Sequence, residues 1–269
     1  MKCPFDKVIV SSDENPKFIR FWPIISKAWK KFFPDVILDL CYITNQKDDD
    51  LYIQYLREHG NVYLYPNITH IPQGNQGKIC RLYHASQQKD LVCSIHDIDS
   101  MPLQRSYLYD LLKLRNKDSL ALIGGEYYSG VDMGKAPMVP TTSEGYNFNE
   151  LFKVGNKNWY DFLEMNKGIK VFDNKEDIMG SSDPIRNPDN YFSDESLLRV
   201  YLRDYKKPIQ WIRRDAIRKL DPFVDWIDRS YRNFTFDKDK LYSGFYTECN
   251  MIRPFDENKM KEIINYIKS

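Results

Sequence analysis

The chain has 269 residues, 42% of them hydrophobic and 29% charged, a composition typical of a globular protein with one large core. Its formal net charge of +1 argues against general electrostatic attraction to nucleic acid or to an anionic membrane. The five cysteines are scattered and show no CxxC spacing, which argues against a disulfide framework or a structural zinc site and fits a reducing compartment.

Hydrophobic periodicity predicts alternating strands and helices over the first 65 residues. Apolar, β-branched runs indicate strands at residues 8–12, 36–44 and 62–65. Residues 16–31 and 48–60 carry apolar side chains at helical spacing and predict the helices between these strands. A β-α-β-α-β order implies parallel strands joined by right-handed crossovers.

The remainder of the chain continues this alternation and contains no repeat, low-complexity tract or clean linker. We therefore expect a single domain over residues 1–269. The expected elements are loops at 73–77 and 130–143, strands at 91–95 and 120–125, helices at 78–88, 105–114, 158–165, 194–202 and 257–268, and short strands and turns between 203 and 246.

Two aspartates, Asp97 and Asp99, follow the apolar strand at 91–95. Side chains two residues apart on an extended strand point the same way, and ligands of open α/β sheets bind at the carboxyl ends of strands. Two neighbouring carboxylates repel each other unless a cation joins them, and Mg²⁺ and Mn²⁺ prefer oxygen ligands. The pair therefore predicts a site for a divalent cation and a nucleotide diphosphate. The alternative is that both residues cap a helix that begins near Leu103.

This DxD pair belongs to a longer resemblance. In order along the chain, residues 7–15 resemble the first strand and nucleotide-contacting loop of GT-A fold glycosyltransferases, and 77–81 resemble the basic helix segment beside the nucleotide or diphosphate. Residues 97–99 match the DxD motif itself, and 192–198 resemble the acidic motif on the acceptor side. The resemblance implies an α/β GT-A (Rossmann-like) fold, a mixed central sheet flanked by helices with an acceptor-side C-terminal part.

The resemblance also divides the domain and assigns roles on the donor side. It implies a nucleotide-sugar-binding half at residues 1–125 and an acceptor-binding half at 126–269. Each assigned residue also has a simpler interpretation, as a turn residue, part of a solvated basic face or a helix cap. The donor-side assignments are Ser11 and Asp13 to the base and ribose, Lys78 and Arg81 to the diphosphate, Asp97 to the ribose or the metal, and Asp99 to the metal.

On the acceptor side, Asp194 and Glu195 are expected at the start of a helix. The resemblance implies that an inverting enzyme uses an acid here as general base, and Asp194 matches best; in a retaining enzyme a similar acid contacts the donor sugar. Stabilisation of the helix dipole is the alternative. Where many relatives place a metal-binding histidine, this chain has Asn250, a weaker oxygen ligand, and Glu248 is an alternative ligand.

Together these features predict a metal-dependent glycosyltransferase that uses Mn²⁺ or Mg²⁺ and a nucleotide-diphosphate sugar. Its partners would be that donor and a hydroxyl acceptor on a glycan, a lipid-linked precursor or a protein, with no nucleic acid. No stretch approaches ~18 apolar residues and the N-terminus has no hydrophobic leader, so we expect a cytoplasmic protein without a transmembrane segment. The alternatives are a phosphohydrolase of the haloacid dehalogenase type and a non-catalytic carbohydrate-binding relative.

Overall fold

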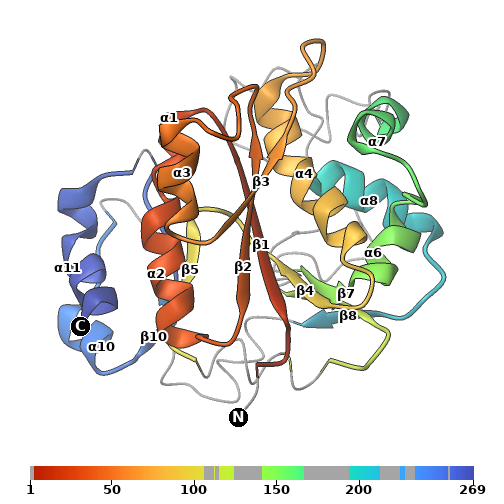
Figure 1. Ribbon diagram of the computed structural model, residues 1–269. Helices are drawn as coiled ribbons and strands as arrows, with labels where there is room; N and C mark the ends of the chain where they lie inside the picture. Colours follow the sequence, from red (N-terminus) through yellow and green to blue (C-terminus); the bar gives the residue numbers. More distant parts are fainter. Residues whose placement is uncertain are drawn as a thin grey trace, which may run out of the picture.

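A mixed seven-stranded sheet forms the centre of the molecule, and helices cover both of its faces (Figure 1). The structure is a computed structural model, and it describes residues 3–105, 112, 115–123, 141–166, 194–212, 225–227, 234–253 and 255–269. The strand order is β3-β2-β1-β4-β7-β6-β8, which confirms the expected α/β architecture with a mixed sheet. These strands are β1 (Lys7–Asp13), β2 (Ile37–Ile43), β3 (Asn61–Tyr65), β4 (Val92–Ile95), β6 (Leu120–Ile123), β7 (Thr141–Glu144) and β8 (Ile209–Ile212).

The parallel part of the sheet determines which of its edges holds the carboxyl ends of β1 and β4. Strands β1, β2 and β3 run parallel, and β4 lies parallel to β1 on its other side. Ile9 of β1 pairs with Ile95 of β4, and the backbone N–H of His96 donates to the carbonyl of Ile9 over 3.0 Å. The carboxyl ends of β1 and β4 therefore meet at one edge. Strand β7 runs antiparallel to both β4 and β6, which makes the sheet mixed.

A second, three-stranded sheet brings the acidic motif next to the C-terminal part of the chain. Its order is β5-β10-β9, formed by β5 (Ser100–Pro102), β10 (Tyr246–Asn250) and β9 (Asp225–Ile227). Strand β5 begins directly after Asp99 and runs antiparallel to β10, so that Ser100 pairs with Asn250. Two of the residues predicted to bind metal are thereby adjacent across a strand pair.

The helices form two hydrophobic clusters on opposite faces of the central sheet. One cluster contains residues of α2, α3 and α11, and the other contains residues of α4, α6, α7 and α8 (Figure 1). Among the described helices, none has the length and apolar character needed to cross a bilayer. The helices are α1 (Pro16–Ile19), α2 (Trp22–Phe32), α3 (Leu51–Arg57), α4 (Gln73–Gln87), α6 (Gly145–Leu151), α7 (Trp159–Asn166), α8 (Asp194–Asp204), α10 (Lys238–Tyr242) and α11 (Glu257–Lys268).

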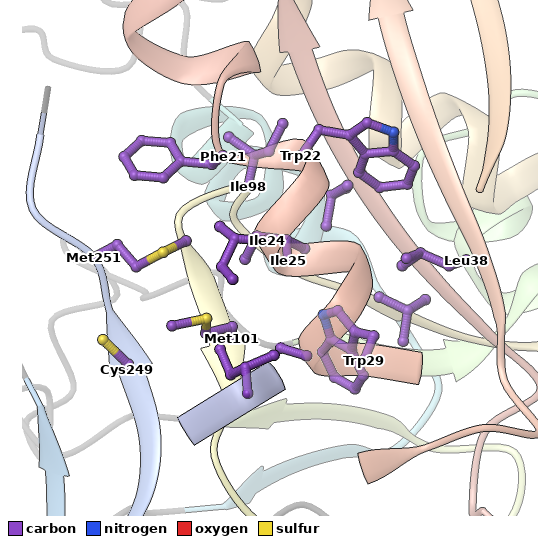
Figure 2. Close-up of a cluster of buried hydrophobic side chains, with 14 of the residues drawn as sticks. Phe21, Trp22, Ile24, Ile25, Trp29, Leu38, Ile98, Met101, Cys249 and Met251 are labelled. Atoms are coloured by element: carbon purple, nitrogen blue, oxygen red, sulfur yellow. The ribbon is translucent and has the colours of Figure 1, made fainter. Parts of the chain in front are cut away.

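The first cluster anchors the backbone on which the aspartate pair lies. Figure 2 shows Ile98 and Met101 packed among side chains of α2 and beside Met251. Ile98 separates the two aspartates and is 5% exposed, while Met101 is 1% exposed. Burial of these two side chains holds the chain between β4 and β5 in one conformation.

Three local predictions were wrong. Residues 73–77 are not a loop, because α4 already begins at Gln73. The buried side chain of Gln76 donates to the carbonyls of Ile68 and Ile71 over 2.9 and 2.7 Å and so orders the chain before the helix. The helix expected at 16–31 is two helices, since Pro23 lies in the first turn of α2, where its missing N–H is tolerated.

The third wrong prediction concerns the loop expected at 130–143. Residues 141–143 belong to β7, which pairs with β4 and is buried in the central sheet, while 130–140 lie outside the described residues. Most of the helix expected at 105–114 also lies outside them, as do residues 124–125. The helices expected at 158–165, 194–202 and 257–268 are confirmed as α7, α8 and α11.

Candidate active site

The candidate site lies at the shared carboxyl edge of β1 and β4. Ser11 and Asp13 belong to the end of β1 and are 7% and 9% exposed, while Asp97 follows β4 with a side chain that is 34% exposed. The first turns of α4 pack against Asp13: a Cβ atom on Gly77 would lie 3.4 Å from its backbone nitrogen. The structure thus brings the predicted nucleotide-side residues to one edge of the sheet.

Arg81 links the aspartate pair to helix α8. Its side chain is 4% exposed, and Nη1 lies 2.8 Å from Oδ1 of Asp97 and also donates to the carbonyl of His96. Nη2 donates to Oδ2 of Asp194, the first residue of α8. Burial alone would lower the pKa of Arg81, but the carboxylates of Asp194 and Asp97 raise it overall, so the guanidinium stays charged. Asp97, Arg81 and Asp194 form one charged bridge, in which Arg81 and Asp194 are buried and Asp97 is partly exposed.

Lys78 and Arg81, both predicted to contact the diphosphate, lie in different environments. Lys78 is exposed on the outer side of α4, whereas the guanidinium of Arg81 is used by protein carboxylates. Lys78 nevertheless affects the site, because its charge opposes the rise in the pKa of Asp13 that burial causes. The backbone N–H of Asn15 also donates to Asp13 Oδ1 over 3.1 Å and opposes that rise.

The second aspartate of the motif is held by an arginine that the sequence analysis did not assign. Asp99 is fully buried; its Oδ1 accepts from Nη2 of Arg253 over 2.7 Å, and its Oδ2 accepts from Nε of Arg253. The Arg253 guanidinium lies 5.3 Å from the ring centroid of Phe18, and the backbone N–H of Met251 donates to the carbonyl of Asp99 over 2.7 Å. The sequence feature that could have indicated this contact is the basic residue three positions after Asn250.

The helix start expected at Asp194 is confirmed, while its acceptor-side role stays a prediction. Helix α8 begins at Asp194, which is 5% exposed, and the side chain of Glu195 lies outside the described residues. Glu248, the alternative metal ligand, accepts a hydrogen bond from Ser100 Oγ over 2.8 Å. That bond ties Glu248 to the residue that follows Asp99.

The residues predicted to bind metal carry the kind of ligand atoms that a hard divalent cation prefers. Asp97, Asp99 and Asn250 offer carboxylate and amide oxygens. Both oxygens of Asp99 are bonded to Arg253, however, and the described part of the chain contains no group of three His, Cys, Asp or Glu side chains arranged to hold a metal. The residues therefore fit a cation provided that it displaces Arg253 from Asp99.

The mixed seven-stranded sheet and its flanking helices match a glycosyltransferase fold of the GT-A type. The chain superposes on apo GlyE of Streptococcus pneumoniae TIGR4 over 98% of its length, with a TM-score of 0.52 and 12% identity, and spans 60% of that protein. An active-site mutant of LgtC gives a TM-score of 0.51 at 12% identity, with 97% of this chain and 95% of LgtC covered.

A second LgtC structure, in complex with donor and acceptor sugar analogs, gives a TM-score of 0.50 at 11% identity and covers 97% of this chain and 94% of LgtC. No protein-family model and no curated protein sequence matches this chain. At these identities the likeness shows a common fold.

Proposed function

We propose that this chain is a glycosyltransferase that takes a sugar from a nucleotide-diphosphate sugar and transfers it to a hydroxyl group of a glycan, a lipid-linked precursor or a protein. The observation that carries this proposal is the Asp97–Arg81–Asp194 bridge at the carboxyl edge of a glycosyltransferase fold. The LgtC structure with donor and acceptor sugar analogs supports it, since that protein shares the fold.

On the donor side, we propose that Ser11 and Asp13 bind the nucleoside and that exposed Lys78 attracts the diphosphate. Arg81 is a positioning residue in this proposal, because its Nη atoms already bind two carboxylates. A bound Mn²⁺ or Mg²⁺ would be held by Asp97, Asp99 and Asn250 and would supply stabilisation of negative charge on the leaving diphosphate.

On the acceptor side, we propose Asp194 as the general base of an inverting transfer, with Glu195 beside it. A base must lie within hydrogen-bonding distance of the hydroxyl that it deprotonates. In this proposal the bond from Arg81 to Oδ2 would hold the carboxylate in place for that task. A retaining transfer would instead use Asp194 to contact the donor sugar.

We also propose that the protein acts in the cytoplasm. All five cysteines, at positions 3, 41, 80, 93 and 249, are buried free thiols. Buried free thiols without a disulfide are typical of proteins from a reducing compartment.

The test is the release of free nucleoside diphosphate from a panel of UDP-, GDP- and dTDP-sugars, with Mn²⁺ and with EDTA. We expect slow, Mn²⁺-dependent hydrolysis of one donor, lost in Asp99→Asn and retained in the matched control Asp90→Asn, which changes an exposed turn. Asp194→Asn should lower acceptor transfer by about 10²–10⁴-fold, the usual contribution of a general base.

Two results would contradict the proposal. Absence of turnover across the panel, with no nucleotide-dependent rise in melting temperature, would favour the non-catalytic relative or the phosphohydrolase. Full transfer activity in Asp194→Asn would remove the assignment of Asp194 as base and leave the donor chemistry in place.

A further inference from the structure

A groove runs between helices α1 to α3 and the C-terminal segment that ends in α11. Helices α2 and α11 lie side by side in Figure 1, and they contact each other. The groove has a cavity volume of about 890 Å³. That volume is in the range of sites that bind small ligands, about 300–1,000 Å³.

The groove is basic, although the chain as a whole is nearly neutral. Five lysine or arginine and two acidic side chains line it, a local charge of +3 compared with +1 for the whole chain. Asp256, one of the two acids, is occupied as the N-cap of α11, where it accepts from the backbone N–H groups of Asn258 and Lys259.

Arg253, one of the five basic residues, is paired with Asp99, whereas the other four have no ion pair among the described residues. These four are Arg20, Lys27, Lys259 and Lys268. Unneutralised cations gathered in a concave surface raise the local concentration of anions.

One wall of the groove is aromatic. Tyr52 and Tyr55 of α3 are 37% and 42% exposed, and their rings stack with centroids 6.1 Å apart at an interplanar angle of 27°. A tyrosine ring presents a flat apolar face together with a hydroxyl that forms hydrogen bonds, which suits the faces and hydroxyl groups of a sugar ring.

The groove and the candidate active site share one residue, Arg253. This residue lines the groove, and its guanidinium binds Asp99 of the acidic motif. A ligand that extends along the groove would therefore reach the residue that holds the second aspartate.

We propose that this groove binds an anionic oligosaccharide, a glycan that carries phosphate, sulfate or carboxylate groups, as the extended part of the acceptor. Arg20, Lys27, Lys259 and Lys268 bind the anionic groups, and the tyrosine pair stacks against the sugar rings. The acceptor role rests on the proposed glycosyltransferase function, whereas binding of the glycan can be measured without turnover.

The experiment titrates the full chain with fluorescently labelled tetrasaccharides: a sulfated heparin fragment, an oligogalacturonate, and neutral maltotetraose. Lys27→Glu/Lys268→Glu reverses two charges in the groove. Lys30→Glu/Lys261→Glu makes the same change on the same helices outside it. We expect an anionic tetrasaccharide to bind more tightly than maltotetraose, the first double variant to weaken it by roughly tenfold or more, and the control to change it less than about twofold.

The aromatic wall is tested separately. Tyr55→Ala should weaken the anionic tetrasaccharide, while Tyr160→Ala, which removes a tyrosine that is 50% exposed outside the groove, should not. Circular dichroism and the melting temperature verify that each variant is folded.

The outcomes separate this inference from the proposed function. Nucleoside diphosphate release that is unchanged in Lys27→Glu/Lys268→Glu, together with lost glycan binding, supports the groove as an acceptor site. Three results would overturn the glycan-binding groove and leave donor turnover in place. They are an equal loss of binding in the control variant, no binding of any tetrasaccharide, and binding of the non-carbohydrate anion hexaglutamate as tight as that of the glycan. Glycan binding without turnover of any donor would overturn the acceptor role.

Discussion

Arg81 is the residue on which the candidate site depends most directly, because it joins side chains that are far apart in the sequence. Asp194 lies 113 positions after it, and Asp97 follows a different strand. Without the guanidinium, the buried carboxylate of Asp194 and the partly exposed carboxylate of Asp97 would have no positive charge between them. Removing one partner of a buried ion pair costs far more than the pair contributes as a whole.

We therefore expect Arg81→Met to lower the free energy of unfolding by about 3–5 kcal/mol. Urea denaturation followed by circular dichroism measures this loss. The matched control is Arg57→Met, since Arg57 pairs with Asp48 at the surface, where ion pairs contribute little. A denaturation midpoint that shifts equally in both variants would contradict the role of Arg81.

Arg253 presents a different case, since it occupies the carboxylate that the predicted cation needs. Burial alone would lower the pKa of Arg253, but the hydrogen bond and charge of Asp99 raise it overall, so the guanidinium stays charged. Any divalent cation that binds Asp99 has to compete with this guanidinium.

Arg253→Gln should accordingly bind Mn²⁺ more tightly than the wild-type chain, by roughly tenfold if one charge-assisted contact is released. Calorimetric titration with Mn²⁺ in the absence of any sugar nucleotide measures the affinity directly. Arg253→Lys keeps the charge but cannot form the two-point contact, so an intermediate affinity is expected. Unchanged or weaker Mn²⁺ binding in Arg253→Gln would show that Arg253 does not compete.

At the scale of secondary-structure elements, a buried polar network connects three strands and one helix on the core side of β2. Asp39 of β2 is fully buried and lies 2.6 Å from Lys7 Nζ of β1 and 2.9 Å from His84 Nε2 of α4. Asn61 of β3 donates to its other oxygen over 2.9 Å. The network fixes α4 against the parallel strands, and α4 carries Arg81 to the site.

This network predicts a dependence of stability on pH. Burial raises the pKa of Asp39, but hydrogen bonds from His84, Lys7 and Asn61 outweigh it and lower the pKa overall. The stabilisation is thus fully present above the unfolded pKa of about 3.9 and is lost as pH falls below it.

Asp39→Asn should lower the free energy of unfolding most at pH 6, by about 3–5 kcal/mol, because it leaves Lys7 buried without its carboxylate. The difference from the wild-type chain should shrink as pH falls below about 4. Urea denaturation at pH 6, 4 and 3 gives both quantities. A difference that is the same at all three values would contradict the assignment.

At the scale of the whole molecule, both sheets are built from the two halves that the sequence suggested. Strands β7 and β8 of the second half complete the central sheet, and β5 of the first half pairs with β10 of the second. Helix α11 packs on α2 in the same hydrophobic cluster. We propose that residues 1–269 form one folding unit.

A single unit should unfold in one transition, followed alike by far-ultraviolet circular dichroism and by tryptophan fluorescence. Ile263→Ala, at a fully buried position of α11, should lower the free energy of unfolding by about 2–5 kcal/mol and shift both signals together. Ile37→Ala, at a position that is 43% exposed, is the control with a smaller expected loss. Two separated transitions would contradict a single unit.

The sequence by itself determined the local features: the alternation of strands and helices, the aspartate pair after β4, and the starts of α8 and α11. These follow from periodicity and capping, which act between residues close in the chain. The prediction of a loop at 73–77 was wrong because the side chain of Gln76 donates to the carbonyls of Ile68 and Ile71 and stabilises the start of α4. Hydrophobic periodicity gives no sign of such side-chain to backbone hydrogen bonds.

Only the tertiary structure decided which charged groups meet. Lys78 and Arg81 read alike in the sequence, yet one is exposed and the other is buried between Asp97 and Asp194. The pairing of Arg253 with Asp99 likewise depends on β10 lying beside β5. Burial and pairing of charges are set by contacts across the folded chain, so no spacing within the sequence could reveal them.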